Sequence, residues 1–109
     1  MKIKELSEKL SLEIINIDDD EREITGGYCG DLLSWVMGKA KSGDVWVTIM
    51  TNINIIAVAS LTDVSCIVLA ENVEINPDII DKASMQGINI YRSPLSEFEL
   101  CTAISEQIN

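Results

Sequence analysis

Two adjacent glycines, Gly26 and Gly27, are the first residues whose type and spacing could do chemistry, because glycines ahead of a helix can hold a phosphate. A Walker loop needs G-x-x-x-x-G-K-[ST], in which the lysine reaches the β- and γ-phosphates. Here only Gly30 follows nearby, and the next lysine is Lys39. The sequence therefore has neither a P-loop nor a complete G-x-G-x-x-G motif. We interpret the pair as a tight bend in which glycine adopts a positive φ, with backbone N–H groups holding a small anion as the alternative.

The thiols and carboxylates suggest no catalytic set. The cysteines are Cys29, Cys66 and Cys101, and the chain has no histidine to serve as their base. We expect Cys29 in an exposed loop and the other two as small buried residues. No pair of carboxylates converges in the sequence pattern, so we expect no catalytic residue and no enzyme activity.

A metal centre is not expected either. Without histidine, a catalytic zinc site lacks its usual ligands. The acidic run from Asp18 to Glu21 does not have EF-hand spacing, and a solvated turn accounts for it. The sequence predicts no cofactor and no metal.

Charge and length limit the classes of partner. The 109 residues suit a single domain, 1–109, and carry a net charge of −10. Only Lys82 and Arg92 are basic after residue 41. We therefore expect neither a nucleic acid nor an anionic membrane as partner. No signal-peptide pattern, no membrane-length apolar run and no disulfide spacing is evident, which predicts a cytoplasmic protein with reduced thiols.

The hydrophobic pattern predicts the elements that must position any site. Helical spacing predicts helices over 2–10, 31–40 (begun by Gly30 or Asp31) and 55–61, a fourth from Asn76-Pro77 to Gly87, and a fifth after Ser93-Pro94. Apolar and β-branched runs predict strands over 12–17, 23–25, 45–50, 65–70 and 88–91.

From residue 45 onward this order reads β-α-β-α-β-α. It predicts a single α/β domain with a mostly parallel sheet flanked by helices. The 55–61 helix is apolar nearly all round, so we expect it to be buried on two sides, in a core or at the contact of a homodimer. In the last helix, one apolar face is expected to hold Leu95, Phe98, Cys101, Ile104 and Ile108.

Ligands of open α/β sheets bind beyond the carboxyl ends of the strands. Small or polar residues follow three of the predicted strands there, and with the glycine segment they form our candidate ligand site: Thr25, Gly26, Gly27, Thr51, Asn52, Asn72 and Ser93. Each of the strand-end residues also serves as an ordinary turn or helix cap, which is the alternative explanation.

Several of these segments together resemble the DRTGG domain family. The resemblance rests on Arg22-x-x-Thr25-Gly26-Gly27-Tyr28, Asp31-Leu32-Leu33-Ser34, Gly43-Asp44-Val45-Trp46, Thr51-x-x-Asn54-Ile55-x-Ala57-Val58-Ala59, Gly87-Ile88-x-Ile90 and Ser93-Pro94. It covers essentially the whole chain. Glu21 stands where the family motif has aspartate.

This resemblance implies a fold like the N-terminal, non-catalytic domain of HPr kinase/phosphorylase. Similar domains accompany phosphotransacetylases and inorganic pyrophosphatases that carry CBS domains, as regulatory and dimerising modules. The kinase chemistry belongs to a domain with a P-loop, which this sequence lacks, so a serine kinase function is not implied.

Three functions follow, in order of preference. The first is a self-associating regulatory module that senses a small anionic ligand or nucleotide, or contacts a protein partner. The exposed character expected for Trp35 and the apolar 55–61 helix favour it. The second is a small-molecule-binding protein with a pocket at the carboxyl ends of the strands. The third is an enzyme of unknown type.

Overall fold

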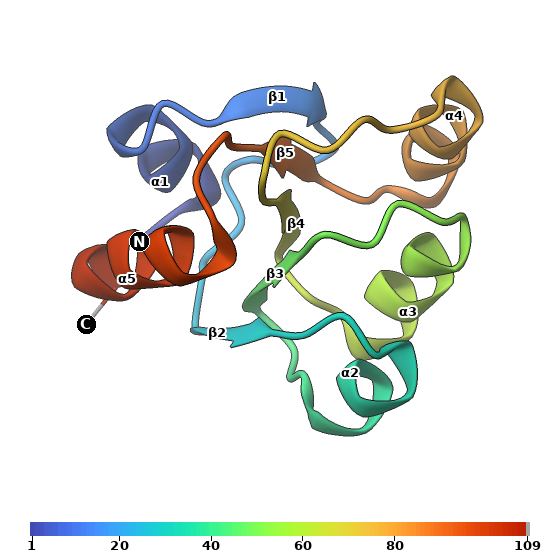
Figure 1. Ribbon diagram of the computed structural model, residues 1–109, viewed down its shortest axis with the longest axis horizontal. Helices are drawn as coiled ribbons and strands as arrows, with labels where there is room; N and C mark the ends of the chain where they lie inside the picture. The colour runs from blue at the N-terminus through green and yellow to red at the C-terminus, as the bar shows by residue number, and fades with distance from the viewer. Residues whose placement is uncertain (109) are drawn as a thin grey trace.

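The computed structural model describes residues 1–108, so the predicted domain 1–109 extends one residue beyond the described part. The chain forms five helices and five strands, drawn in Figure 1. In order they are α1 (Ile3–Lys9), β1 (Glu13–Asn16), β2 (Gly26–Cys29), α2 (Leu33–Lys39), β3 (Asp44–Thr48), α3 (Asn54–Thr62), β4 (Cys66–Leu69), α4 (Pro77–Gln86), β5 (Ile90–Arg92) and α5 (Glu97–Ile108).

The strands form one mostly parallel sheet in the order β1-β5-β4-β3-β2. The neighbouring strands β2, β3, β4 and β5 are parallel, whereas β1 pairs antiparallel with β5. Three successive crossovers run in one direction along the sheet, so their helices α2, α3 and α4 all lie on the same face. Helices α1 and α5 cover the other face, as Figure 1 shows. The predicted α/β architecture is confirmed.

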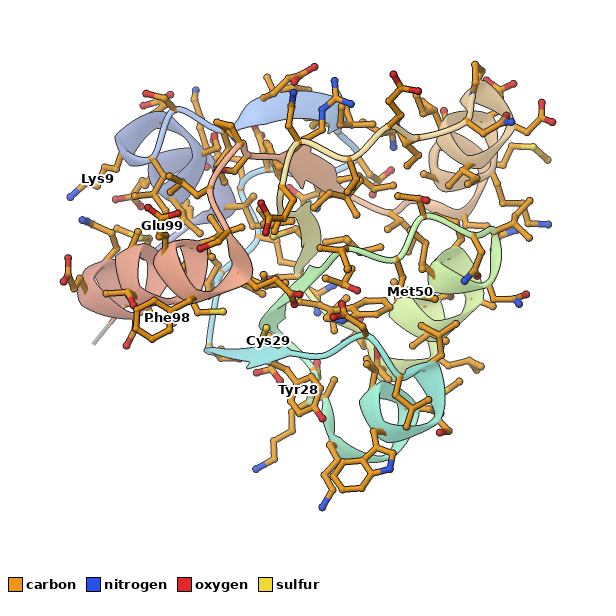
Figure 2. The ribbon with its side chains drawn as sticks, in the orientation of Figure 1. Lys9, Tyr28, Cys29, Met50, Phe98 and Glu99 are labelled. Atoms are coloured by element: carbon orange, nitrogen blue, oxygen red, sulfur yellow. The ribbon has the colours of Figure 1, made fainter. Side chains whose placement is uncertain are left out.

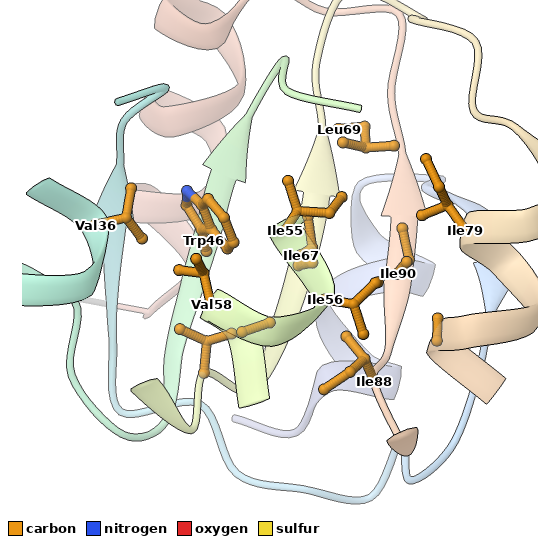
Figure 3. Packing of buried hydrophobic residues seen from close by; sticks show 13 residues of the cluster. Val36, Trp46, Ile55, Ile56, Val58, Ile67, Leu69, Ile79, Ile88 and Ile90 are labelled. Carbon is orange, nitrogen blue, oxygen red and sulfur yellow. The ribbon is translucent and has the colours of Figure 1, made fainter. Parts of the chain in front are cut away.

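Side-chain alternation along the strands divides the core into two layers. Under α2, α3 and α4 it holds Trp46, Ile67 and Ile90 with the apolar face of α3, as Figure 3 shows. Under α1 and α5 it holds Val45, Val47, Cys66, Val68, Tyr91, Leu100 and Ile104. Both faces of β3 and β4 are fully buried, which explains why their sequences read as continuous apolar runs.

The prediction of a glycine bend was wrong. Gly26 and Gly27 begin the edge strand β2, and among the described residues only Gly43 and Gly87 are glycines with positive φ. The predicted strand 23–25 is correspondingly displaced: Glu23 forms only an isolated antiparallel bridge with Lys2. A short edge strand that begins with two glycines lacks both β-branched residues and alternation, so pattern alone does not identify it.

Three further predictions about helices need correction. Helix α2 begins at Leu33 without a side-chain cap, so neither Gly30 nor Asp31 caps it. On α5, Phe98 is 82% exposed and Leu100 takes the buried position. Helix α3 buries only one side within this chain, because Leu61 is 73% exposed, so burial on two sides in the core was wrong and burial at a homodimer contact stays a prediction. The caps predicted at Asn76 and Gly87 of α4 are confirmed.

Candidate functional site

Arg22, the first residue of the family-like motif, connects the segment before β2 to the turn after α3. Its guanidinium donates to the backbone carbonyls of Asp63 (2.6 Å) and Val64 (3.3 Å), and forms an ion pair with the Asp63 carboxylate at 3.1 Å. The Asp63 carboxylate also accepts a hydrogen bond from Ser42. These contacts hold Asp63 in its left-handed conformation and direct the Arg22 guanidinium to the protein itself.

Thr25 fixes the start of β2 against the turn before β3. Its hydroxyl donates to the carbonyl of Ser42 at 3.1 Å, and its N–H donates to the carbonyl of Gly43 at 3.0 Å. Gly26 lies so close to β3 that a Cβ there would be 2.8 Å from the Asp44 Oδ1 atom. The glycine therefore allows a close approach between the two strands.

Asp31 performs a similar structural role at the other end of β2. Its Oδ1 atom accepts from the Thr48 hydroxyl (2.8 Å) and from the Ile49 N–H (3.0 Å). The carboxylate thereby closes the connection between β2 and α2 onto the end of β3. Arg22, Thr25, Gly26 and Asp31 thus form contacts within the chain that position the two ends of β2.

The polar residues at the strand ends are likewise engaged in turns. Asn52 Oδ1 accepts from the Asn54 N–H at 2.9 Å, and Ser93 Oγ accepts from the Leu95 N–H at 3.1 Å. The Asn72 N–H donates to the Ser93 carbonyl at 2.9 Å, so these two residues do lie together. The structure gives no side-chain hydrogen bond for Thr51, which is half-buried.

The predicted site residues divide between the two ends of the sheet. Gly26 pairs with Asp44 at the amino end of β3, whereas Thr51 and Asn52 follow its carboxyl end. A single pocket therefore does not contain Thr25 together with the strand-end residues. Sequence reasoning missed this because it placed the glycines after a strand rather than at the start of one.

The structure has a groove between β2 and α5, on the face opposite α2. Its volume is about 320 Å³, and it is lined by Gly26, Gly27, Tyr28, Cys29, Val45, Val47, Cys101, Ile104, Ser105 and Ile108. Gly27 pairs with Val45, whose side chain lies in the core layer beneath α5. Because paired residues of parallel strands point to the same face, the missing side chain of Gly27 leaves the floor of this groove open.

Two thiols line the groove, and a carboxylate lies beside one of them. Cys29 donates from its sulfur to Glu97 Oε2 at 3.2 Å, joining β2 to the first turn of α5. Figure 2 shows Cys29 beside α5, with the exposed Phe98 on the same helix. Desolvation raises the pKa of the Cys29 thiol, and the hydrogen bond to Glu97 raises it further. This environment disfavours the thiolate, which is the form that an activated catalytic cysteine needs.

Partial burial also changes the pKa of Glu97. Desolvation raises the pKa of Glu97, and the neighbouring carboxylates of Asp31 and Glu71 raise it as well, while the Cys29 thiol lowers it.

Among residues 1–108, no group of three or more cysteines and carboxylates could hold a metal ion. No helix in this part of the chain is long and apolar enough to cross a membrane.

No protein-family model matches the chain, and no curated protein does. The fold is similar to a crystal structure of the CBS and DRTGG domains of the regulatory region of Clostridium perfringens pyrophosphatase, complexed with the activator diadenosine tetraphosphate. The TM-score is 0.74 at 17% identity, over 98% of this chain and 46% of that one. The chain thus spans about half the length of that region. This likeness supports a DRTGG-like fold, in agreement with the resemblance seen in the sequence.

Proposed function

We propose that this chain is a non-catalytic regulatory module that binds a nucleotide-like small molecule. The observation that carries the proposal is the likeness of its fold to a regulatory region complexed with a nucleotide activator. The surroundings of Cys29 support the non-catalytic part of this proposal, because desolvation and the hydrogen bond to Glu97 raise the pKa of its thiol.

The groove between β2 and α5 is the place we propose for the ligand. Its volume lies at the lower end of the range of small-molecule sites. Valine and isoleucine side chains form its walls, and the backbone of Gly27 forms part of its floor. Such a site suits a flat ring held by dispersion and burial, as a nucleobase would be.

The residues around the groove favour recognition of the nucleobase ring of a ligand over recognition of its phosphates. None of the residues that line the groove is basic, and the two arginines of the chain are engaged elsewhere, Arg22 with Asp63 and Val64 and Arg92 with Glu13. Glu97 accepts a hydrogen bond from Cys29, which lines the groove, and the chain carries a net charge of −10. A polyphosphate would therefore gain little from this surface.

Thermal-shift measurements with adenosine, ATP, diadenosine tetraphosphate and pyrophosphate test this proposal. A ligand that binds only the folded protein raises its stability by about 2.7 kcal/mol at a hundredfold excess over Kd. We expect the adenine compounds to raise Tm and pyrophosphate to leave it unchanged. A shift with pyrophosphate alone would contradict recognition through the ring.

Gly27→Ala locates the site. The new Cβ would lie 3.6 Å from the Val45 carbonyl oxygen, an ordinary contact, and would project into the groove. We expect weaker ligand-induced stabilisation with little loss of basal stability. Gly38→Ala on α2, where a Cβ meets nothing within 4 Å, is the matched control and should bind normally.

We also propose that the module self-associates through the outer faces of α3 and α4. Ile53, Leu61 and Met85 are exposed there, beside a shallow groove lined in part by Ala57 and Lys82. Apolar side chains gathered on one face favour contact with a second copy.

Light scattering should give the mass of a dimer for the wild type and of a monomer for Leu61→Glu. Phe98→Glu, on α5, should remain dimeric; a monomeric wild type would refute the proposal.

A further inference from the structure

The two cysteines at the groove, Cys29 and Cys101, form a pair that the proposed ligand site does not use. Cys29 belongs to the edge strand β2 and Cys101 to the second turn of α5. Both residues line the groove, and the neighbouring Cys101 thiol raises the pKa of the Cys29 thiol. They are separated by most of the chain in sequence, so only the tertiary structure brings them together.

Access differs among the three cysteines. Cys29 is exposed and Cys101 is partly exposed, whereas Cys66 is fully buried in β4. Burial raises the pKa of the Cys66 thiol to about 12. The chain therefore carries two accessible neighbouring thiols and one internal thiol that serves as a control.

We propose that Cys29 and Cys101 form a reversible redox pair, which a low-molecular-weight disulfide such as oxidised glutathione converts into a disulfide between β2 and α5. In intracellular proteins, disulfides of this kind are transient and redox-sensing rather than structural. The proposal goes beyond the ligand-binding function and does not depend on it.

The reaction balances as two thiol–disulfide exchanges. Cys101, as its thiolate, attacks oxidised glutathione first, because desolvation and Glu97 disfavour the thiolate of Cys29; a mixed disulfide forms and one glutathione is released. The second protein thiol then attacks the protein sulfur of the mixed disulfide, which releases the second glutathione. When Cys29 is the second thiol, its proton passes to the Glu97 carboxylate, to which it already donates. The protein loses two electrons and two protons, and glutathione disulfide gains them.

A disulfide between Cys29 and Cys101 would hold the two sides of the groove, β2 and α5, at a fixed separation. The Cys29–Glu97 hydrogen bond would be lost, because the sulfur no longer carries a proton. Helix α5 would be tied covalently to a sheet edge that carries no further strand in the described chain. A disulfide that closes so long a segment of chain restricts the unfolded state and so raises Tm.

The test equilibrates the reduced, desalted protein with glutathione buffers of increasing oxidised fraction, followed by acid quenching, alkylation and mass spectrometry. We expect the protein to become lighter by two hydrogen atoms, with linked peptides containing Cys29 and Cys101. Cys66 should be alkylated only after denaturation. Dithiothreitol should restore three alkylatable thiols.

Cys66→Ser should behave as the wild type, while Cys29→Ser and Cys101→Ser should show no loss of two hydrogens. Oxidation should raise Tm by several degrees in the wild type and leave it unchanged in Cys101→Ser. Three free thiols at the highest oxidised fraction would overturn the proposal. So would stable glutathione adducts without ring closure, a disulfide to Cys66, or a disulfide between two chains.

Discussion

Gly43 and Thr25 are in such close contact that no β-carbon fits on Gly43. Its φ is +86°, in the region that favours glycine, and the missing side chain leaves room for the Thr25 hydroxyl and methyl groups. Thr25 in turn donates to the carbonyls of Ser42 and Gly43. This contact fixes where β2 begins, and therefore which residues of β2 face the groove.

Gly43→Ala should destabilise the protein by about 2 kcal/mol or more, because backbone strain adds to the clash with Thr25. Urea unfolding measures the change in the free energy of unfolding. Gly38→Ala is the control, since it lies in a helix with open space around it and should be neutral or stabilising by about 1 kcal/mol. Equal effects of the two substitutions would contradict the role assigned to the contact.

Arg22→Ala should cost about 1 to 3 kcal/mol, because two carbonyls of the turn after α3 lose a charged donor. Asp63→Asn should cost less, about 1 kcal/mol at most, since the ion pair is exposed and asparagine tolerates a positive φ. Denaturant unfolding of both variants measures the order. A larger loss for Asp63→Asn would show that the ion pair, and not the carbonyl contacts, dominates.

Acid should weaken the contribution of Asp63. The Ser42 hydroxyl, followed by Arg22, holds the pKa of Asp63 below its usual value. This contribution to stability is present above about pH 4, the unfolded value, and is lost as pH falls through the lower folded-state pKa. The stability difference between wild type and Asp63→Asn should therefore shrink at low pH. A difference independent of pH would argue against this assignment.

Glu97 should have the opposite pH dependence. Desolvation, with the nearby carboxylates of Asp31 and Glu71, raises its pKa, so the folded state favours its protonated form. Its ionisation should reduce stability as pH rises from about 4.3 through the raised folded-state pKa. Glu97→Gln should remove this decrease and be more stable than the wild type near neutral pH. Parallel pH profiles of the two proteins would refute the expectation.

The two tryptophans provide a direct test of the core. Trp46 is fully buried and donates from Nε1 to the Gly30 carbonyl at 3.0 Å, whereas Trp35 is 60% exposed. Trp46→Phe should cost about 2 kcal/mol, because it leaves a cavity and an unsatisfied carbonyl. Trp35→Phe should cost about 0.5 kcal/mol or less. Acrylamide should quench the fluorescence that remains in Trp46→Phe much more strongly than that in Trp35→Phe.

The sequence by itself determined the architecture from residue 45 onward. Buried strands such as β3 and β4 have continuous apolar runs, and α4 begins at an Asn-Pro cap and ends at a glycine. These are local signals, because burial on both faces and capping act on neighbouring residues. The exposure of Trp35 and the burial of Cys66 were also predicted correctly.

Only the tertiary structure decided the backbone conformation of the glycine segment. Gly26 and Gly27 are extended because β3 provides the hydrogen-bonding partner for an edge strand, which no local propensity encodes. The position of Phe98 was mispredicted because the helical face of α5 is set by its contact with the sheet. For the same reason, the meeting of Cys29 with Glu97 and Cys101 depends on how α5 crosses the edge of the sheet. That long-range packing brings together residues that sequence spacing does not relate.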